Sequence, residues 1–155
     1  MLRMGVLAAV TAGLCVAAPD GGRAETSSDY SWSLTAPKYE SLASRIAPPK
    51  GFYRDPVQPG SFAHWLRYLP LKAGGTRVRY HNGGLKFNQL VHYAVVDIDV
   101  GKRNLQQCAD AVIRLRSEFL YAKGMLDEIA YNFTSGDRVA FSRWSQGWRP
   151  RVRGA

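Results

Sequence analysis

The chain has 155 residues and a formal net charge of +9 at pH 7. Hydrophobic residues make up 46% of it and charged residues 21%, which is the balance of a globular domain and excludes a disordered or fibrous protein. The length allows one domain with a modest core, and the positive charge favours anionic partners.

The first 24 residues have the pattern of an export signal. A short basic start that contains Arg3 is followed by an uncharged apolar stretch at residues 5–18. This stretch is shorter than the roughly 20 residues of a membrane-spanning helix. Gly22 and Ala24 supply the small side chains that a signal peptidase selects. The sequence therefore predicts a signal peptide at residues 1–24, an exported protein that is periplasmic or secreted, and no transmembrane segment after cleavage.

Cleavage at this position removes Cys15 and leaves Cys108 as the only cysteine. No internal disulfide can then form, so Cys108 is free, paired with another chain, or buried. A retained membrane anchor and a lipid attached to Cys15 are the alternatives to cleavage. In an exported protein the positive charge favours peptidoglycan or another anionic envelope polymer as the partner and disfavours nucleic acid.

Two short helices are predicted in the first half of the chain. Polar residues 25–36 indicate a linker, and a short helix with Pro37 in its first turn follows. After a proline-rich connector, residues 61–69 predict a second helix that Ser61 caps and Pro70 ends. The apolar side of the second helix consists of Phe62, Trp65, Leu66 and Leu69.

Strands are predicted in the middle and near the end of the chain. Asn82-Gly83 stands between two strand-like runs and indicates a hairpin turn. Residues 89–101 are rich in β-branched and aromatic side chains, which predicts a central strand. Two further strands are expected around a turn at residues 134–137.

The longest predicted helix spans residues 104–124, with Asn104 and Gln107 as a capping pair and Gly124 as the stop. The elements together predict an α+β fold in one domain at residues 37–150, followed by a basic tail at 151–155. In this fold a small antiparallel or mixed sheet packs against one long helix and one or two short helices.

Cys108 lies on the apolar side of the long helix, and two interpretations of it stay open. The apolar positions are Leu105, Cys108, Val112, Leu115, Phe119 and Ala122. A cysteine on this side is either a small, inert core residue or a nucleophile. In the first turn, unpaired backbone N–H groups and the helix dipole favour a thiolate, and Lys102 and Arg103 add positive charge upstream.

A cysteine nucleophile also needs a base and a donor for the oxyanion. Gln107, or Gln106 beside it, is the candidate donor. His92, on the strand that leads toward the helix, is the candidate base. The remaining histidines are interpreted as a helix packing residue and a turn residue, His64 and His81. No spacing in the sequence indicates a metal site, and no cofactor is expected.

Two further pairs of residues allow a functional and a structural interpretation. Asp97 and Asp99 alternate along the predicted strand, so they are either an acid–base or cation-binding pair or its polar end. Trp144 and Trp148 either stack on sugars or cap the surface.

Four blocks carry a resemblance to a known family. In order, "SFAHWLRYLPL", "HYAVVDIDVG", "LQQCADAVIRLRSEFLYAKG" and "NFTSGD" resemble an uncharacterised bacterial family, domain of unknown function 4846 (DUF4846). The resemblance covers residues 46–150. It implies a longer chain, in which a Gly-Asp and a histidine-bearing stretch follow the cysteine in the order found in papain-like cell-wall peptidases and amidases.

Cys108 matches the position of the nucleophile in that order. The chain ends at Ala155 with no later histidine, which predicts a C-terminally truncated member that holds the N-terminal half of the family domain. The expected function is therefore an exported envelope protein derived from a papain-like cysteine peptidase or amidase, without a complete catalytic set. The alternative is a non-catalytic envelope protein that binds an anionic polymer or a protein partner.

Overall fold

The computed structural model describes residues 30–35 and 39–151. The predicted signal peptide, residues 25–29 and 36 of the predicted linker, Pro37 and residues 152–155 lie outside these ranges. The elements in chain order are β1 (Glu40–Ser41), α1 (Leu42–Arg45), α2 (Phe62–Arg67), β2 (Pro70–Leu71), α3 (Cys108–Ala122), the 3₁₀ helix η2 (Leu126–Glu128), β3 (Ala130–Asn132), β4 (Arg138–Ala140) and α4 (Phe141–Ser145).

Side-chain caps determine where the two short helices begin. The hydroxyl group of Ser61 accepts a hydrogen bond from His64 N at 3.1 Å, which confirms the predicted start of α2. Ser41 caps α1 in the same way through Ser44 N, at 3.2 Å. The predicted start of α1 near Pro37 is therefore wrong. The backbone before Ser41 is extended because Glu40 pairs with β2.

A small antiparallel sheet forms around β2. In it Glu40 of β1 pairs with Leu71, and Leu71 also bridges Val96 on its other side. The predicted strand at residues 89–101 is therefore reduced to the surroundings of Val96, where Lys72 N donates to Val95 O at 2.8 Å. Most apolar side chains before this point are exposed, so the composition of the segment reflects a surface and not a buried strand.

The C-terminal hairpin confirms the two strands predicted around residues 134–137. Tyr131 of β3 pairs with Val139 of β4, and Phe133 N donates to Asp137 O at 2.9 Å to close the turn. After β4 the chain turns into α4, a helix that the sequence did not predict. Two antiparallel sheets beside helices confirm the α+β class.

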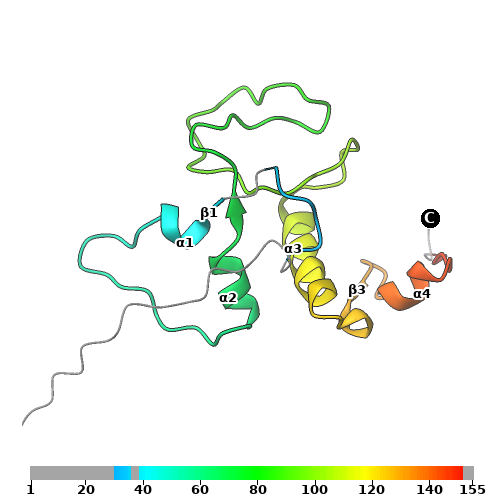
Figure 1. Ribbon diagram of the computed structural model, residues 1–155. Helices are drawn as coiled ribbons and strands as arrows, with labels where there is room; N and C mark the ends of the chain where they lie inside the picture. Colours follow the sequence, from blue (N-terminus) through cyan, green and yellow to red (C-terminus); the bar gives the residue numbers. More distant parts are fainter. Residues whose placement is uncertain (1–29, 36–38, 152–155) are drawn as a thin grey trace, which may run out of the picture.

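An aromatic core joins α2, α3 and the hairpin. Its buried members are Tyr30, Trp65, Leu69, Phe119, Leu120 and Ile129. Figure 1 shows α2 beside α3, and Phe62 of α2 packs on Phe119 of α3 with ring centroids 5.2 Å apart. The buried residues of α3, Phe119 and Leu120, are in its second half. In its first half Val112, on the predicted apolar side, is 68% exposed. Within the described residues, no helix combines the length and apolarity needed to cross a membrane.

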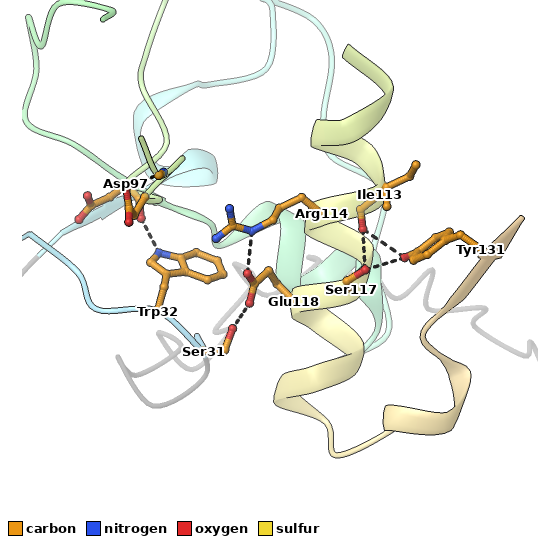
Figure 2. Close-up of polar contacts among 10 residues, drawn as sticks. Ser31, Trp32, Asp97, Ile113, Arg114, Ser117, Glu118 and Tyr131 are labelled. Atoms are coloured by element: carbon orange, nitrogen blue, oxygen red, sulfur yellow. Dashed lines mark hydrogen bonds and ion pairs between the residues drawn. The ribbon is translucent and has the colours of Figure 1, made fainter. Parts of the chain in front are cut away.

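Residues 30–35, predicted as part of a polar linker, contribute Tyr30 and Trp32 to this core. Tyr30 is 5% exposed, and its hydroxyl group donates to Tyr68 O at 2.7 Å. Figure 2 shows Ser31 donating to the carboxylate of Glu118 on α3, which also accepts from Arg114. The polar composition of the segment concealed its aromatic anchors, so the predicted linker ends before residue 30.

Candidate functional site

Cys108 is the first residue of α3 and is exposed to solvent. The interpretation of Cys108 as a buried core residue is therefore wrong. Leu105 and Val112, the residues next to Cys108 in the predicted apolar pattern, are exposed as well. The start of α3 therefore does not pack into the core. Among the described residues, none forms a hydrogen bond with the Cys108 sulfur.

The cap of α3 differs from the predicted pair Asn104–Gln107. Gln107 is the N-cap residue, and its backbone N–H donates to the Asp110 carboxylate at 3.1 Å. Asp110 thus places a negative charge in the helical turn that holds Cys108. This charge opposes the stabilisation that the helix dipole and the free N–H groups offer a thiolate.

His92, the candidate base, has a hydrogen bond that is directed elsewhere. Its Nε2 lies 3.2 Å from the carbonyl oxygen of Thr76, so this nitrogen carries the proton in the neutral ring. Nδ1 is buried and has no hydrogen-bond partner among the described residues. The structure therefore connects His92 to its own loop and not, by any hydrogen bond, to Cys108.

The paired carboxylates are separated by their surroundings. Asp97 is 3% exposed, and its carboxylate accepts two hydrogen bonds from Thr35. Asp99 is exposed and accepts from Gly101 N at 2.9 Å. These contacts are structural, and they favour the interpretation of both aspartates as the polar end of the segment. The described residues contain no group of three or more side chains that could hold a metal ion.

Trp144 and Trp148, around α4, are each covered by an arginine. The guanidinium group of Arg149 lies 4.7 Å from the centroid of the Trp144 ring, and that of Arg143 lies 4.1 Å from the Trp148 ring. The two pairs cross, since each arginine contacts the tryptophan five residues away in the sequence. Each contact contributes roughly 0.5–1 kcal/mol at an exposed site, which is enough to orient a side chain.

The two arginines differ in the hydrogen bonds that they make. Arg149 Nη1 donates to the carbonyl oxygens of Trp144 and Trp148, both at 2.9 Å, and thereby holds the segment after α4. Arg143 is exposed, and its guanidinium group donates to none of the described residues. Arg143 therefore presents a fixed, unpaired guanidinium group to solvent, the fork that binds carboxylate and phosphate groups.

An apolar groove lies beside this Trp–Arg cluster, which we define as Arg143, Trp144, Trp148 and Arg149. The groove has a cavity volume of about 340 Å³. Period-two alternation directs Ile129, Tyr131 and Phe133 of the hairpin to the same side. The full lining is Ile113, Ser117, Ile129, Tyr131, Asn132, Phe133, Val139, Phe141 and Trp144.

Sequence reasoning singled out Trp144 and Trp148 but missed Arg143 and Arg149. The signal is present in "RWSQGWRP", where an arginine precedes the first tryptophan and another follows the second. Spacing of five residues does not align side chains on one helix, so only the turn after α4 brings the pairs together.

Comparison with known proteins identifies the family but no activity. No curated protein and no solved structure matches the chain. The model of the family described as "Domain of unknown function (4846)" matches residues 42–155, which include α3 with Cys108 and the whole Trp–Arg cluster. The match covers more than half of the chain, and the protein therefore belongs to the DUF4846 family.

Proposed function

We propose that the protein is an exported protein of the bacterial cell envelope that binds an anionic polymer without catalysing a reaction. The observation that carries this proposal is the stacking of Arg143 on Trp148, which holds an exposed guanidinium group in place while leaving its donors free. Export rests on the basic and apolar pattern of residues 1–24.

An anionic polymer suits the cluster because of the geometry of the guanidinium group. Its planar fork of N–H donors matches the two oxygens of a carboxylate or phosphate group. Peptidoglycan carries carboxylates along its peptides, and other envelope polymers carry phosphates. Stacking on Trp148 lowers the cost of ordering Arg143 when such a group binds.

Stacking of sugars on the tryptophans is supported less well. The Trp144 ring packs on Phe141 with centroids 5.9 Å apart and an interplanar angle of 27°, and Arg149 lies over the same ring. Trp148 carries Arg143. A sugar would have to displace one of these groups, whereas an anion would bind to the guanidinium groups where they stand.

Binding is favoured over catalysis by the surroundings of Cys108. A cysteine hydrolase needs a base within hydrogen-bond reach of the thiol, and the His92 ring is bonded to Thr76 O instead. Asp110 adds a negative charge close to the sulfur. The parts that activate a nucleophile are thus not assembled among the described residues.

A pull-down on purified peptidoglycan tests the binding function. We expect binding at low ionic strength that decreases steeply between about 0.05 and 0.5 M salt, because exposed charges are screened over this range. Arg143→Gln is expected to weaken binding about tenfold, since a charge-assisted hydrogen-bond pair is lost. The matched control is Arg138→Gln, which removes an exposed arginine of β4 outside the cluster.

Two results would contradict the proposal. Binding that is unchanged at high salt would exclude recognition of anions. Equal losses for Arg143→Gln and Arg138→Gln would reduce the effect to net charge and remove the role of the cluster.

A cysteine hydrolase is the second candidate function, and the exposure of Cys108 at the start of α3 favours it. Incubation of the protein with peptidoglycan, followed by chromatography of the soluble products, tests this function. Release of peptides or amines that disappears in Cys108→Ser and persists in Arg143→Gln would establish hydrolysis. We expect no release of peptides or amines by the unsubstituted protein or by these two variants.

A further inference from the structure

Residues 73–94 leave the body of the fold between β2 and the contact at Val96, and we call them the excursion. Figure 1 shows the excursion as green loops above α1, α2 and α3. The Trp–Arg cluster is around α4, near the C-terminus, and Figure 1 shows α4 well apart from these loops. The surface of the excursion is therefore a separate feature of the molecule.

The excursion is ordered by its own hydrogen bonds. Arg79 and Leu85 form an antiparallel bridge around the turn, where Gly83 has a φ of +84° that favours glycine. The side-chain amide of Gln89 donates to Val78 O at 3.0 Å and accepts from Val78 N at 2.9 Å. Asn88 in turn accepts from Leu90 N at 2.9 Å. The shape of the loops therefore does not depend on burying their apolar side chains.

These apolar side chains face solvent to an unusual degree. Phe87 is 97% exposed and Leu90 is 96% exposed, so neither side chain packs to any extent against the described residues. The other exposed large side chains of the excursion are Tyr80, Leu85, Val91 and Tyr93. Such a concentration on two neighbouring loops marks a surface that another body covers.

The charge of the same segment has one sign. No aspartate or glutamate occurs between Asp55 and Asp97, whereas the excursion contains Arg77, Arg79 and Lys86. None of these three side chains forms an ion pair with a described residue. The excursion therefore combines exposed apolar tips with unpaired positive charge.

We propose that the excursion docks the protein on the surface of an anionic phospholipid bilayer. Phe87 and Leu90 enter the boundary between headgroups and acyl chains, while Arg77, Arg79 and Lys86 contact the headgroup phosphates. Tyrosines such as Tyr80 and Tyr93 have the amphipathic ring that is enriched at this depth. A polysaccharide would satisfy the charges but leave the apolar side chains in water, and a bilayer accommodates both.

Co-sedimentation of the full chain with vesicles tests the proposal. We expect binding to vesicles of mixed phosphatidylglycerol and phosphatidylcholine, and binding at least about tenfold weaker to phosphatidylcholine alone, because each basic side chain near an anionic surface strengthens binding roughly fivefold. Phe87→Ser combined with Leu90→Ser is expected to weaken binding about tenfold through lost apolar burial. Phe52→Ser is the matched control, since Phe52 is also highly exposed but lies outside the excursion.

The depth of insertion provides a second measurement. In Phe87→Trp, part of the tryptophan emission is expected to be quenched by brominated phosphatidylcholine in the mixed vesicles, beyond any quenching seen for the unsubstituted chain. Both proteins contain the apolar run at residues 5–18, so any lipid binding by that run contributes equally to the two signals.

Three results would overturn the proposal. Equal binding by the double variant and the Phe52→Ser control would place the lipid contact elsewhere. Absence of binding to both types of vesicle would exclude a bilayer as the partner of the excursion. Self-association in analytical ultracentrifugation that Phe87→Ser abolishes, without lipid binding, would make a second copy of the chain the occupant. The effect of Arg143→Gln on peptidoglycan binding does not bear on any of these results. Polymer binding by the Trp–Arg cluster and bilayer docking by the excursion can therefore be refuted independently.

Discussion

Thr35 donates two hydrogen bonds to the buried carboxylate of Asp97, from its backbone nitrogen at 2.7 Å and from its hydroxyl group at 2.8 Å. The backbone oxygen of Asp97 also accepts from the indole nitrogen of Trp32 at 2.5 Å (Figure 2). Lys72 Nζ lies 3.9 Å from the other carboxylate oxygen. Asp97 thus joins the N-terminal segment to the small sheet.

Asp97→Ala is expected to lower the free energy of unfolding by about 2–3 kcal/mol, because it leaves the two donors of Thr35 without their buried acceptor. Denaturation in urea measures the change. Asp99→Ala is the control, since Asp99 is exposed and caps only Gly101 N, and its cost is expected below about 1 kcal/mol. Equal costs would deny Asp97 its structural role.

Tyr30→Ala is expected to cost about 3–5 kcal/mol, as for other large aromatic core residues. Tyr30 packs on Trp65 with ring centroids 5.5 Å apart, although it precedes the residues that the family model matches. The matched control is Tyr53→Ala, because Tyr53 is 85% exposed, and its cost is expected within about 0.5 kcal/mol. A small cost for Tyr30→Ala would show that residues 30–35 are dispensable for the core.

Iodoacetamide is expected to label Cys108 in the folded protein, because the thiol is exposed. Asp110→Asn keeps an acceptor for Gln107 N but removes the nearby negative charge, so the labelling rate is expected to rise about two- to fivefold. Peptide mapping by mass spectrometry follows the rate at Cys108. Asp127→Asn, on the distant η2, is expected to leave it unchanged, and a rise in both variants would point to net charge alone.

Tyr131→Phe is expected to cost about 1 kcal/mol, since its hydroxyl group lies 2.9 Å from Ser117 Oγ and donates to Ile113 O at 3.1 Å (Figure 2). Ser117→Ala removes the other hydroxyl group, which donates to the same carbonyl. A double-mutant cycle from thermal melting is expected to give a combined cost smaller than the sum of the two. Strict additivity would mean that the two hydroxyl groups do not act together.

The parts of the fold that local chemistry determines were predicted from the sequence. The start of α2 follows from the cap at Ser61, and the stop of α3 follows from Gly124, which has a φ of +72°. The C-terminal hairpin follows from its alternating pattern and its turn residues. Each of these features depends on side chains within a few residues of one another.

The parts that depend on distant contacts were not predicted. The segment at residues 89–101 has the composition of a buried strand, but only Val96 finds a partner in β2. In the predicted linker, Tyr30 and Trp32 reach partners more than thirty residues away. The separation of Asp97 from Asp99 depends on Thr35 in the same way. No periodicity in the sequence encodes which distant segment will cover a residue.

For the candidate site, the sequence located Cys108 at the start of a helix but left its exposure open, because the apolar pattern of α3 continues past the point where packing stops. The roles of Cys108, Gln107 and His92 in catalysis stay predictions. The contact of Arg143 with Trp148 was not predicted, because it depends on the turn after α4 that brings the two side chains together.

The partners of residues 30–35 also constrain the order of events during synthesis. Asp97 is synthesised 62 residues after its partner Thr35, and Glu118 is synthesised 87 residues after its partner Ser31. The segment therefore emerges from the ribosome well before it has anything to bind. For the export that we propose, this delay means that residues 30–35 still lack their partners at the stage when a translocation channel would require an unfolded chain.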